Sequence, residues 1–335
     1  MRSFPGKGIF QRAIHRASHV SSRLAAPFRH CDISIFHDFS PPPTGGGHQF
    51  LRALKREWER RGFRVEINSV SRSTRACLLN SYNFDAERFL FLRRAGCRTV
   101  HRVDGPLSAY RGYDDGTDRR IEEWNREFAQ GTVIQSQFSL KAHFGLGLIF
   151  RNPVVIPNAA DPEIFYPPEW PVYPHGRKLR VISTSWSDNP NKGTDIYKWL
   201  DRNLDFGRIE YTFVGRLSAE TKNIRVMSPI SSHELADLLR ASDVYLTASL
   251  NDPCSNSLIE ALSCGLPAIY RRSGGHPELV GRGGQGFDSA GEIPALLDQM
   301  METLGEYRNN IHPPRITDVA DQYLSVLGVM GKVQR

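Results

Sequence analysis

The chain lacks any apolar run that could cross a bilayer, because about 20 consecutive apolar residues are needed and the longest run, residues 144–150, is a fraction of that length. Cysteine is scarce as well. The five cysteines are odd in number and contain no C-x-x-C pair, which argues against a disulfide framework or a zinc site. We therefore expect a protein of the reducing cytoplasm without an integral membrane segment.

Acidic residues are missing from residues 1–30, which carry most of the excess behind the net charge of +7. Apolar residues recur at helical spacing between Ile9 and Leu24, as in a basic amphipathic helix lying on an anionic membrane. That interpretation implies peripheral contact with the inner face of the membrane. A solvated arm and an organellar transit peptide fit the same composition and stay open. The remaining chain is nearly neutral, so we expect no nucleic-acid partner.

The 335 residues, 40% of them apolar, are enough for two domains. Strands alternate with helices, which indicates α/β architecture with parallel sheets. Prolines crowd residues 161–178 at a density that neither a helix nor an interior strand tolerates, so we place an interdomain linker at 166–178, between domains at 31–165 and 179–314. The expected strands are 31–36, 63–70, 76–79, 99–103, 133–135, 179–184, 209–214, 224–226 and 243–248, and the expected helices are 49–61, 136–144, 195–203, 232–241 and 317–329.

Two acids flank a polar turn and the start of a helix at residues 252–260. Asp252 lies just past a strand, at the carboxyl end where open parallel sheets bind ligands. Ser255 or Asn256 can cap the following helix, and the free N–H groups of Asn256 and Ser257 can seat a phosphate. Glu260, one turn further, faces the same crevice and could accept two hydrogen bonds from a sugar diol. The segment is a predicted ligand site.

This spacing of two acids, followed by Ala-Leu-Ser-Cys-Gly-Leu-Pro, resembles the E-x7-E signature of retaining glycosyltransferases of family 4. Further matches are 43–47, 155–161, 191–193 and 274–280. The resemblance implies a GT-B fold, in which two Rossmann-like domains with parallel sheets face each other across a cleft. The first would be the acceptor side, with a C-terminal helix at 315–335 packing back onto it, and the second would bind a nucleotide-sugar.

The implied reaction moves a sugar from the nucleotide-sugar to a hydroxyl of a glycan or glycolipid with retention of configuration, and it needs no metal or other cofactor. The implied catalytic residues are His101, at a strand end that meets the donor sugar, Lys192 on the diphosphate, Asp252 on sugar hydroxyls and Glu260 on the ribose. Donor contacts are expected from Gly46, Gly47, Trp186, Arg216, Pro229, Ile230, Asn256 and Ser257. Asp104 could hold the acceptor hydroxyl or cap the turn that follows it.

Two departures from the family pattern keep alternatives open. Asp252 is one methylene shorter than the family's Glu, and Trp186 stands where many members place an Arg, so Trp186 could stack on the nucleotide while Arg216 substitutes as the cation. A non-catalytic sugar-nucleotide-binding scaffold and a nucleotide-sugar 2-epimerase remain as rival functions. The pair Asp114–Asp115 lies between glycines, which favours a solvated turn over a metal site.

Overall fold

The computed structural model describes residues 30–40, 46–169 and 176–329. The expectations for the basic leader therefore lie outside the described residues, as do the start of the glycine-rich loop and the middle of the proline-rich linker. None of the helices in the described parts combines the length and apolar character that crossing a bilayer requires.

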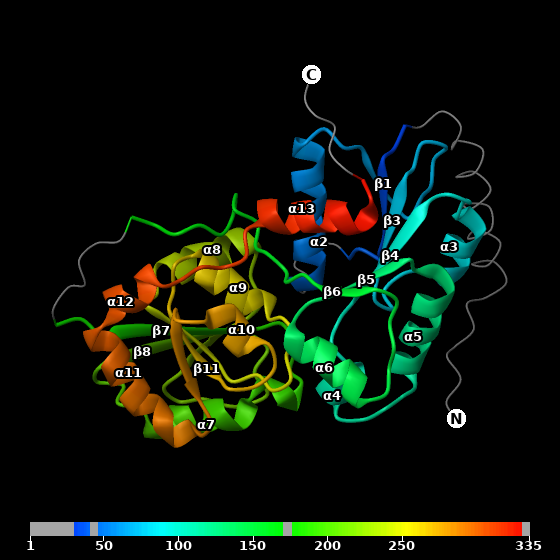
Figure 1. The fold of residues 1–335 in the computed structure, drawn as a ribbon. Coiled ribbons are helices and arrows are strands. Elements are labelled where there is room, and N and C mark those ends of the chain that lie inside the picture. Colours follow the sequence, from blue (N-terminus) through cyan, green and yellow to red (C-terminus); the bar gives the residue numbers. More distant parts are fainter. Residues whose placement is uncertain (1–29, 41–45, 170–175, 330–335) are drawn as a thin grey trace.

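The first domain is built on a six-stranded parallel sheet with the order β2-β1-β3-β4-β5-β6 (Figure 1). Its strands are β1 (Ile33–Phe36), β2 (Val65–Ile67), β3 (Ala76–Asn80), β4 (Arg98–Val103), β5 (Gly131–Ile134) and β6 (Pro153–Val155). Its helices are α2 (Gly46–Arg60), α3 (Ala86–Leu92), α4 (Leu107–Arg111), α5 (Thr117–Phe128) and α6 (Gln137–Gly145).

The second domain repeats this plan with the order β12-β11-β10-β7-β8-β9, again parallel throughout. Its strands are β7 (Leu179–Ser185), β8 (Ile209–Gly215), β9 (Arg225–Met227), β10 (Val244–Thr247), β11 (Ala268–Arg271) and β12 (Gly284–Phe287). Its helices are η2 (Pro190–Lys192), α7 (Thr194–Asn203), α8 (Ser232–Arg240), α9 (Asn256–Ser263), α10 (His276–Val280), η3 (Ala290–Glu292), α11 (Ile293–Glu302) and α12 (Leu304–Asn309). The predicted α/β architecture of two parallel sheets is confirmed.

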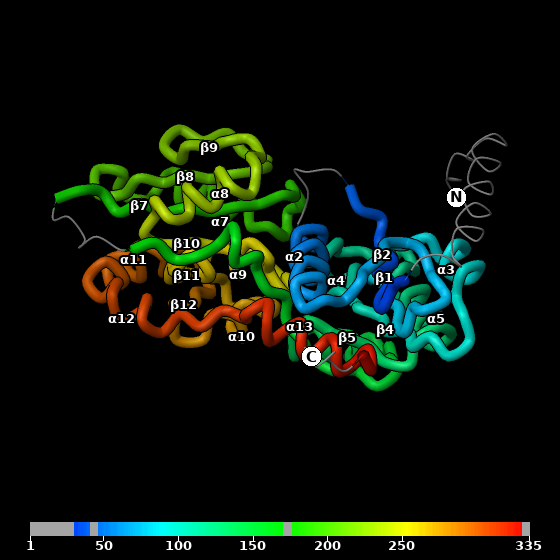
Figure 2. The backbone as a smooth tube through the Cα atoms, turned by 90° about the horizontal axis from the view of Figure 1, so that it is seen from above, coloured from blue at the N-terminus to red at the C-terminus, as the bar shows by residue number. Residues whose placement is uncertain are grey.

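The last helix, α13 (Ile316–Leu327), returns from the second domain to the first. Its buried face, which includes Tyr323 and Leu324, joins the core formed by α2 and the first sheet. The Trp58 indole N–H donates to the Ala320 carbonyl at 3.4 Å, so α2 and α13 are also linked by a hydrogen bond. Figure 2 shows α13 beside α2 at the junction of the two lobes.

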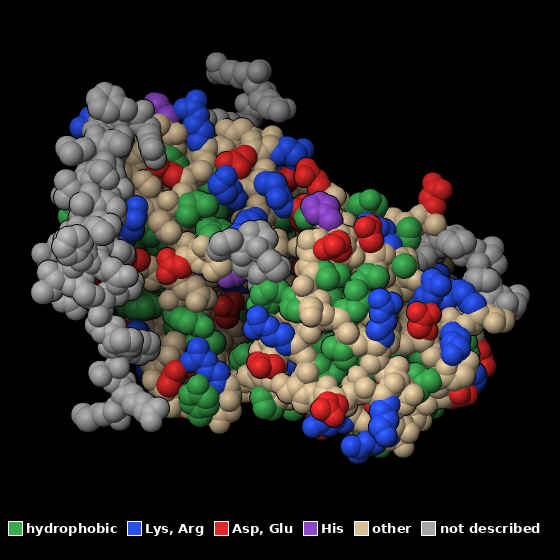
Figure 3. Space-filling view, turned by 180° about the vertical axis from the view of Figure 1, so that it is seen from behind, with side chains coloured by type: hydrophobic (Ala, Val, Ile, Leu, Met, Phe, Trp, Pro, Cys, Tyr) green, Lys and Arg blue, Asp and Glu red, His purple; other side chains and the backbone are tan. Residues whose placement is uncertain are grey.

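Element ends differ from the sequence prediction where the backbone has a local reason. The strand expected over 63–70 ends at Ile67 because Asn68 has φ 51°, a left-handed conformation that a strand cannot continue through. Strands β6, β11 and β12 were not predicted. Charges of both signs are interspersed on the face seen in Figure 3, as the nearly neutral body of the chain predicts.

Candidate functional site

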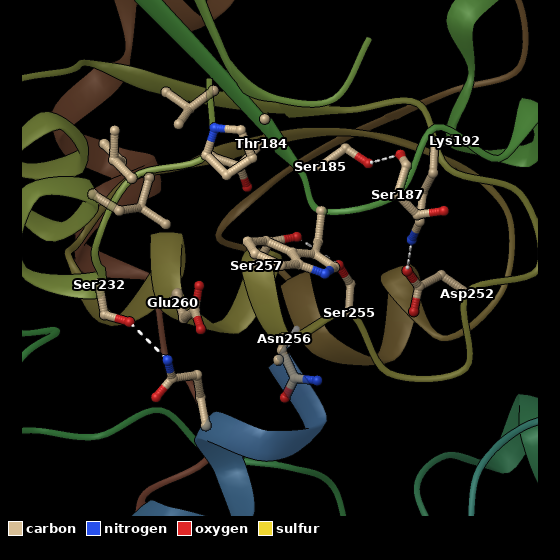
Figure 4. Close-up of a pocket in the computed structure, with 18 of the residues that line it drawn as sticks. Thr184, Ser185, Ser187, Lys192, Ser232, Asp252, Ser255, Asn256, Ser257 and Glu260 are labelled. Atoms are coloured by element: carbon tan, nitrogen blue, oxygen red, sulfur yellow. Dashed lines mark hydrogen bonds and ion pairs between the residues drawn. The ribbon is translucent and has the colours of Figure 1, made fainter. Parts of the chain in front are cut away.

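A cavity of about 310 Å³ lies between the domains, at the carboxyl edge of the second sheet (Figure 4). Its walls come from the strand ends and following loops of β7, β8 and β10, from the first turns of α8 and α9, and from α2 and α4 of the first domain. The lining residues are Gly46, Gln49, Tyr110, Thr184, Ser185, Trp186, Ser187, Lys192, Val214, Gly215, Pro229, Ile230, Ser232, Leu235, Asp252, Cys254, Ser255, Asn256, Ser257 and Glu260. This position at the carboxyl edge of a parallel sheet is where such folds bind ligands.

The N-terminus of α9 opens into this cavity. Ser255 is the N-cap, and its hydroxyl accepts a hydrogen bond from the Leu258 N–H, which decides between the two caps that the sequence allowed. The N–H groups of Asn256 and Ser257, in the first helical turn, have no intrahelical acceptor. A Cβ on Gly46 would lie 2.3 Å from the Asn256 Cβ, so only glycine lets α2 approach α9 this closely. Two helix N-termini, each with a partial positive charge, therefore meet at the cavity.

Lys192 and Asp252 bind each other across the cavity wall. The Lys192 ammonium lies 2.8 Å from a carboxylate oxygen of Asp252 and 5.4 Å from the centre of the Tyr110 ring. Burial disfavours the charged form of both groups, but the attraction between the two opposite charges outweighs this effect. The pKa of Asp252 is therefore lowered and the pKa of Lys192 is raised. Gly193, with φ 85°, packs against the Ala248 backbone, where a Cβ would lie 2.6 Å from the carbonyl oxygen. The sequence predicted both ionic residues but not their pairing.

Glu260 points into the cavity from the second turn of α9 (Figure 4). Its carboxylate makes no hydrogen bond or ion pair with the part of the chain that the structure describes. Burial raises the pKa of Glu260 to about 8. A half-buried carboxyl group that opens to a cavity is set to receive hydrogen-bond donors from a ligand.

The remaining predicted donor residues are divided between the cavity and its surroundings. Trp186, Pro229 and Ile230 line the cavity. Arg216 does not line it, but its guanidinium lies 5.4 Å from the centre of the Trp186 ring, so the cation and the aromatic ring form one stacked unit. Gly47 lies in the first turn of α2 without lining the cavity, and the space beside its Cα is open.

The expectation that His101 faces the cleft is wrong. Its ring is fully buried in the first domain, its Nε2 lies 2.8 Å from the Ser81 carbonyl oxygen, and its edge packs on Phe84. Burial lowers the pKa of His101 to about 4. The physical reason is that helices cover both faces of a parallel sheet, so a side chain within β4 points into a helical layer. Only a residue beyond the last strand position, here Asp104, reaches the interdomain edge.

Asp104 belongs to a buried polar network that the sequence did not reveal. Its carboxylate accepts hydrogen bonds from Gln135 and from the guanidinium of Arg102, the latter at 2.9 Å. Arg102, fully buried, also donates to Asn158 at 3.0 Å, and the Asn158 amide donates to Asn256 of α9 at 3.1 Å. The network therefore connects the first domain to the helix of the second domain that opens into the cavity. The sequence offered one clue to this network, because its polar residues stand at or just beyond the ends of the strands.

The acidic pair Asp114–Asp115 forms a turn, as predicted. The Asp114 carboxylate accepts from the Gly116 N–H at 2.8 Å, and Asp115 pairs with Arg111 at 2.7 Å. Among the residues that the structure describes, no group of three or more potential metal ligands comes together.

Glu278 joins the two domains. Its carboxylate accepts hydrogen bonds from the backbone N–H groups of Gln137 (2.8 Å) and Phe138 (2.7 Å), at the N-terminus of α6 in the first domain. A side-chain cap of this kind contributes about 1 kcal/mol. Since this cap joins the two domains, its free energy stabilises the arrangement of the domains seen in the structure.

Replacing Glu278 by Ala is therefore expected to shift the open-to-closed equilibrium about fivefold toward open, which follows from about 1 kcal/mol. Small-angle X-ray scattering would detect this as a larger radius of gyration than that of the wild type. Glu306→Ala, at an exposed position of α12, is the matched control. Equal radii for both variants would show that Glu278 does not hold the cleft closed.

Comparisons with known proteins agree with this geometry. Residues 213–307 match the family model for glycosyl transferases group 1. A D-inositol 3-phosphate glycosyltransferase of Corynebacterium efficiens is 27% identical over 192 residues, which are 57% of this chain and 39% of that protein. An MMP alpha-(1->4)-mannosyltransferase of Mycolicibacterium hassiacum is 27% identical over 164 residues, or 45% of this chain and 38% of that protein. The matches thus span about two fifths of these relatives' own length.

Solved structures show the same architecture along most of the chain. Sucrose-phosphate synthase of Thermosynechococcus elongatus superposes with a TM-score of 0.68 at 14% identity, covering 89% of this chain and 98% of that one. Anabaena HepE in complex with UDP-glucose gives 0.61 at 15% identity, covering 90% and 97%. At such identities the likeness concerns the fold. Residues 213–307 are therefore similar to group 1 glycosyltransferases, and the chain that contains them has the GT-B fold.

Proposed function

We propose that this protein transfers a sugar from a nucleotide-sugar donor to a hydroxyl of a glycan or glycolipid acceptor, with retention of configuration. The observation that carries the proposal is the cavity between the domains, where the N-terminus of α9, the Lys192–Asp252 pair and the Glu260 carboxyl converge. These groups match the charge and hydroxyl pattern of a nucleoside diphosphate sugar. The match of residues 213–307 to group 1 glycosyltransferases supports it.

Each group has a chemical role in this proposal. Glu260 accepts hydrogen bonds from the ribose hydroxyls, and Asp252 accepts them from hydroxyls of the donor sugar. An ammonium has three N–H donors, so Lys192 can keep its bond to Asp252 and still bind the diphosphate with the other two. Lys192 and the α9 N–H groups then stabilise the charge that develops on the leaving diphosphate, so no metal is required.

The reaction needs no enzymic nucleophile. The acceptor oxygen bonds to the anomeric carbon on the face from which the diphosphate departs, the bond from that carbon to the phosphate oxygen breaks, and the acceptor's proton passes to the leaving phosphate. Closure of the domains over the cavity would exclude water, which would otherwise hydrolyse the donor. The interdomain hydrogen bonds of Glu278 and Asn158 support such a closed state.

Thermal shift with nucleotides tests the proposal. The ligands are UDP, GDP, ADP, dTDP and CMP with their common sugar conjugates, and UDP-glucose is a natural first choice because HepE binds it. A ligand at about 100 times its dissociation constant adds roughly 2.7 kcal/mol of stability. We expect one nucleotide class to raise the melting temperature of the wild type and of Glu302→Ala, an exposed control, but not of Glu260→Ala.

Turnover decides between transfer and the rival functions. Release of free nucleotide only when an acceptor is present supports the transferase. Conversion of the donor without any acceptor would indicate an epimerase, and binding without turnover would indicate a scaffold. Failure of every nucleotide to shift the wild type would contradict the proposed site.

A further inference from the structure

The carboxyl edge of the first sheet carries a polar side chain at or just after almost every strand. They are His37 after β1, Asn80 at the end of β3, Asp104 after β4, Gln135 after β5 and Asn158 in the loop after β6. None of these five lines the donor cavity. Buried polar groups must be hydrogen-bonded, so the partners of these side chains define what the edge can offer a ligand.

Three hydrogen bonds connect a buried cation to a half-buried histidine. The Arg102 guanidinium donates to the Asn80 side-chain oxygen at 2.6 Å. The Asn80 amide nitrogen lies 3.1 Å from Nδ1 of His37, and Nε2 of His37 lies 2.9 Å from Nδ1 of His48. A guanidinium can only donate, so it fixes the orientation of Asn80, with the amide oxygen toward Arg102 and the NH2 group toward His37.

This orientation selects one tautomer of His37. The Asn83 carbonyl also lies near Nδ1 of His37, at 3.2 Å, but it already accepts the Asp38 N–H at 2.8 Å. A proton on Nδ1 could be donated to the Asn83 carbonyl, but that oxygen already accepts one hydrogen bond. The same proton would leave the buried Asn80 NH2 group without an acceptor, and this loss costs more free energy than the extra hydrogen bond to Asn83 supplies. Nδ1 of His37 is therefore an acceptor, and its proton is on Nε2.

The tautomer of His37 in turn determines the tautomer of His48. Because Nε2–H of His37 donates to Nδ1 of His48, that nitrogen is an acceptor, and the single proton of neutral His48 is on Nε2. Both rings are neutral at pH 7, since burial lowers the pKa of His37 to about 4 and also lowers the pKa of His48. Within the described part of the chain, Nε2 of His48 has no hydrogen-bond partner.

We propose that the Nε2–H of His48 binds an oxygen of the acceptor substrate, and that His37 and Asn80 position it by fixing its tautomer. This inference rests on the proposed function. His48 stands in the first turn of α2 and its ring contacts His37, just after β1, so it lies at the carboxyl edge of the first sheet and outside the lining of the donor cavity. A hydrogen bond donated to the attacking oxygen would make it a weaker nucleophile, so His48 holds a neighbouring oxygen, a hydroxyl or an oxyanion of the acceptor.

Nitrogen-15 NMR of the imidazole rings in the full-length wild type tests the relay without any substrate. We expect His48 to carry its proton on Nε2. In His37→Phe we expect His48 to lose its preference for the Nε2–H tautomer. In His37→Gln we expect the preference to return, because the Gln amide can donate to Nδ1 of His48 in place of the Nε2–H of His37. His312→Gln, at an exposed histidine, is the control. A proton on Nδ1 of wild-type His48 would overturn the relay.

Ligand probes test the acceptor contact. With a nucleoside diphosphate present, we add methyl α-D-glucopyranoside to supply hydroxyl oxygens or inorganic phosphate to supply an oxyanion. We expect one probe to shift the His48 resonances of the wild type. His48→Leu should then bind that probe about five- to tenfold more weakly, with nucleotide affinity unchanged, and His48→Gln should recover most of the loss.

The outcomes separate this inference from the proposed function. No response from either probe, or His48→Gln as weak as His48→Leu, would overturn the acceptor contact. A wild type that binds no nucleotide would instead contradict the proposed function, while the tautomer of His48 would still be measurable. If His48→Leu does not fold, the wild-type spectra with the two probes decide.

Discussion

Lys192→Ala is expected to lower kcat by about 10²- to 10³-fold, the usual effect of removing one donor that stabilises a developing anion. The ammonium is largely buried and paired with Asp252 at 2.8 Å, so it meets a ligand in a dry site where its charge is poorly screened. Steady-state kinetics with the nucleotide-sugar found by thermal shift would measure the effect. Lys55→Ala, which removes a partly exposed ammonium paired with Glu59 outside the cavity lining, should leave kcat within about twofold.

The alternative is that Lys192 matters only for folding. Its removal leaves the buried Asp252 carboxylate unpaired, which costs about 3–5 kcal/mol of stability. The double variant Lys192→Met/Asp252→Asn removes both charges and should recover stability. If it recovered kcat as well, Lys192 would be a structural ion-pair partner and the proposed diphosphate contact would be wrong. If kcat stayed low while the melting temperature returned, the loss of activity would belong to the chemistry of the Lys192–Asp252 pair and not to folding.

The sequence predicted the alternation of strands and helices, although it missed α5 and α11, which are as long as helices that it did predict. Helix 195–203 and strand 209–214 differ from α7 and β8 by one residue at an end, since several turns or alternations fix them. Of the strands with three or four residues, β5 and β9 were predicted, whereas β6 and β11 were not. The strand β12, with the sequence GQGF, carries two glycines and was not predicted.

The candidate site was predictable only where sequence neighbours act together. Asp252, Asn256 and Glu260 lie on one strand–turn–helix unit, so their shared orientation follows from local geometry. The network of Arg102 and Asn158 joins residues 56 apart in the sequence, and its partners follow only from how the sheet and the domains assemble. The error on His101 has the same origin, because one position along a strand decides whether a side chain meets a helix or the cleft.

Glu260 is expected to make nucleotide binding pH-dependent. Its pKa is about 8 in the empty cavity, because burial disfavours the charged form. Hydrogen bonds donated by the ribose hydroxyls favour the carboxylate, so binding must lower this pKa and release a proton. Affinity should therefore rise with pH up to about 8, by at most tenfold per unit, and level off above it.

The stability of the unliganded protein should respond with the opposite sign. The pKa of Glu260 is raised on folding, from the ordinary 4.5 to about 8, so its contribution to stability is fully present below pH 4.5 and is lost as the pH rises through 8. A bound nucleotide relieves part of this loss. The stabilisation by nucleotide in a thermal-shift assay should thus be larger at pH 8 than at pH 6.

Calorimetry in buffers of different ionisation enthalpy would count the released protons. Between pH 6.5 and 7.5 we expect up to one proton per nucleotide in the wild type and none from this site in Glu260→Gln, which keeps the shape and removes the titration. The buried histidines do not compete in this window, because burial lowers the pKa values of His101, His143 and His276 below 6.5. Equal proton release by wild type and Glu260→Gln would mean that the nucleotide does not contact Glu260, and the ribose assignment would have to be given up.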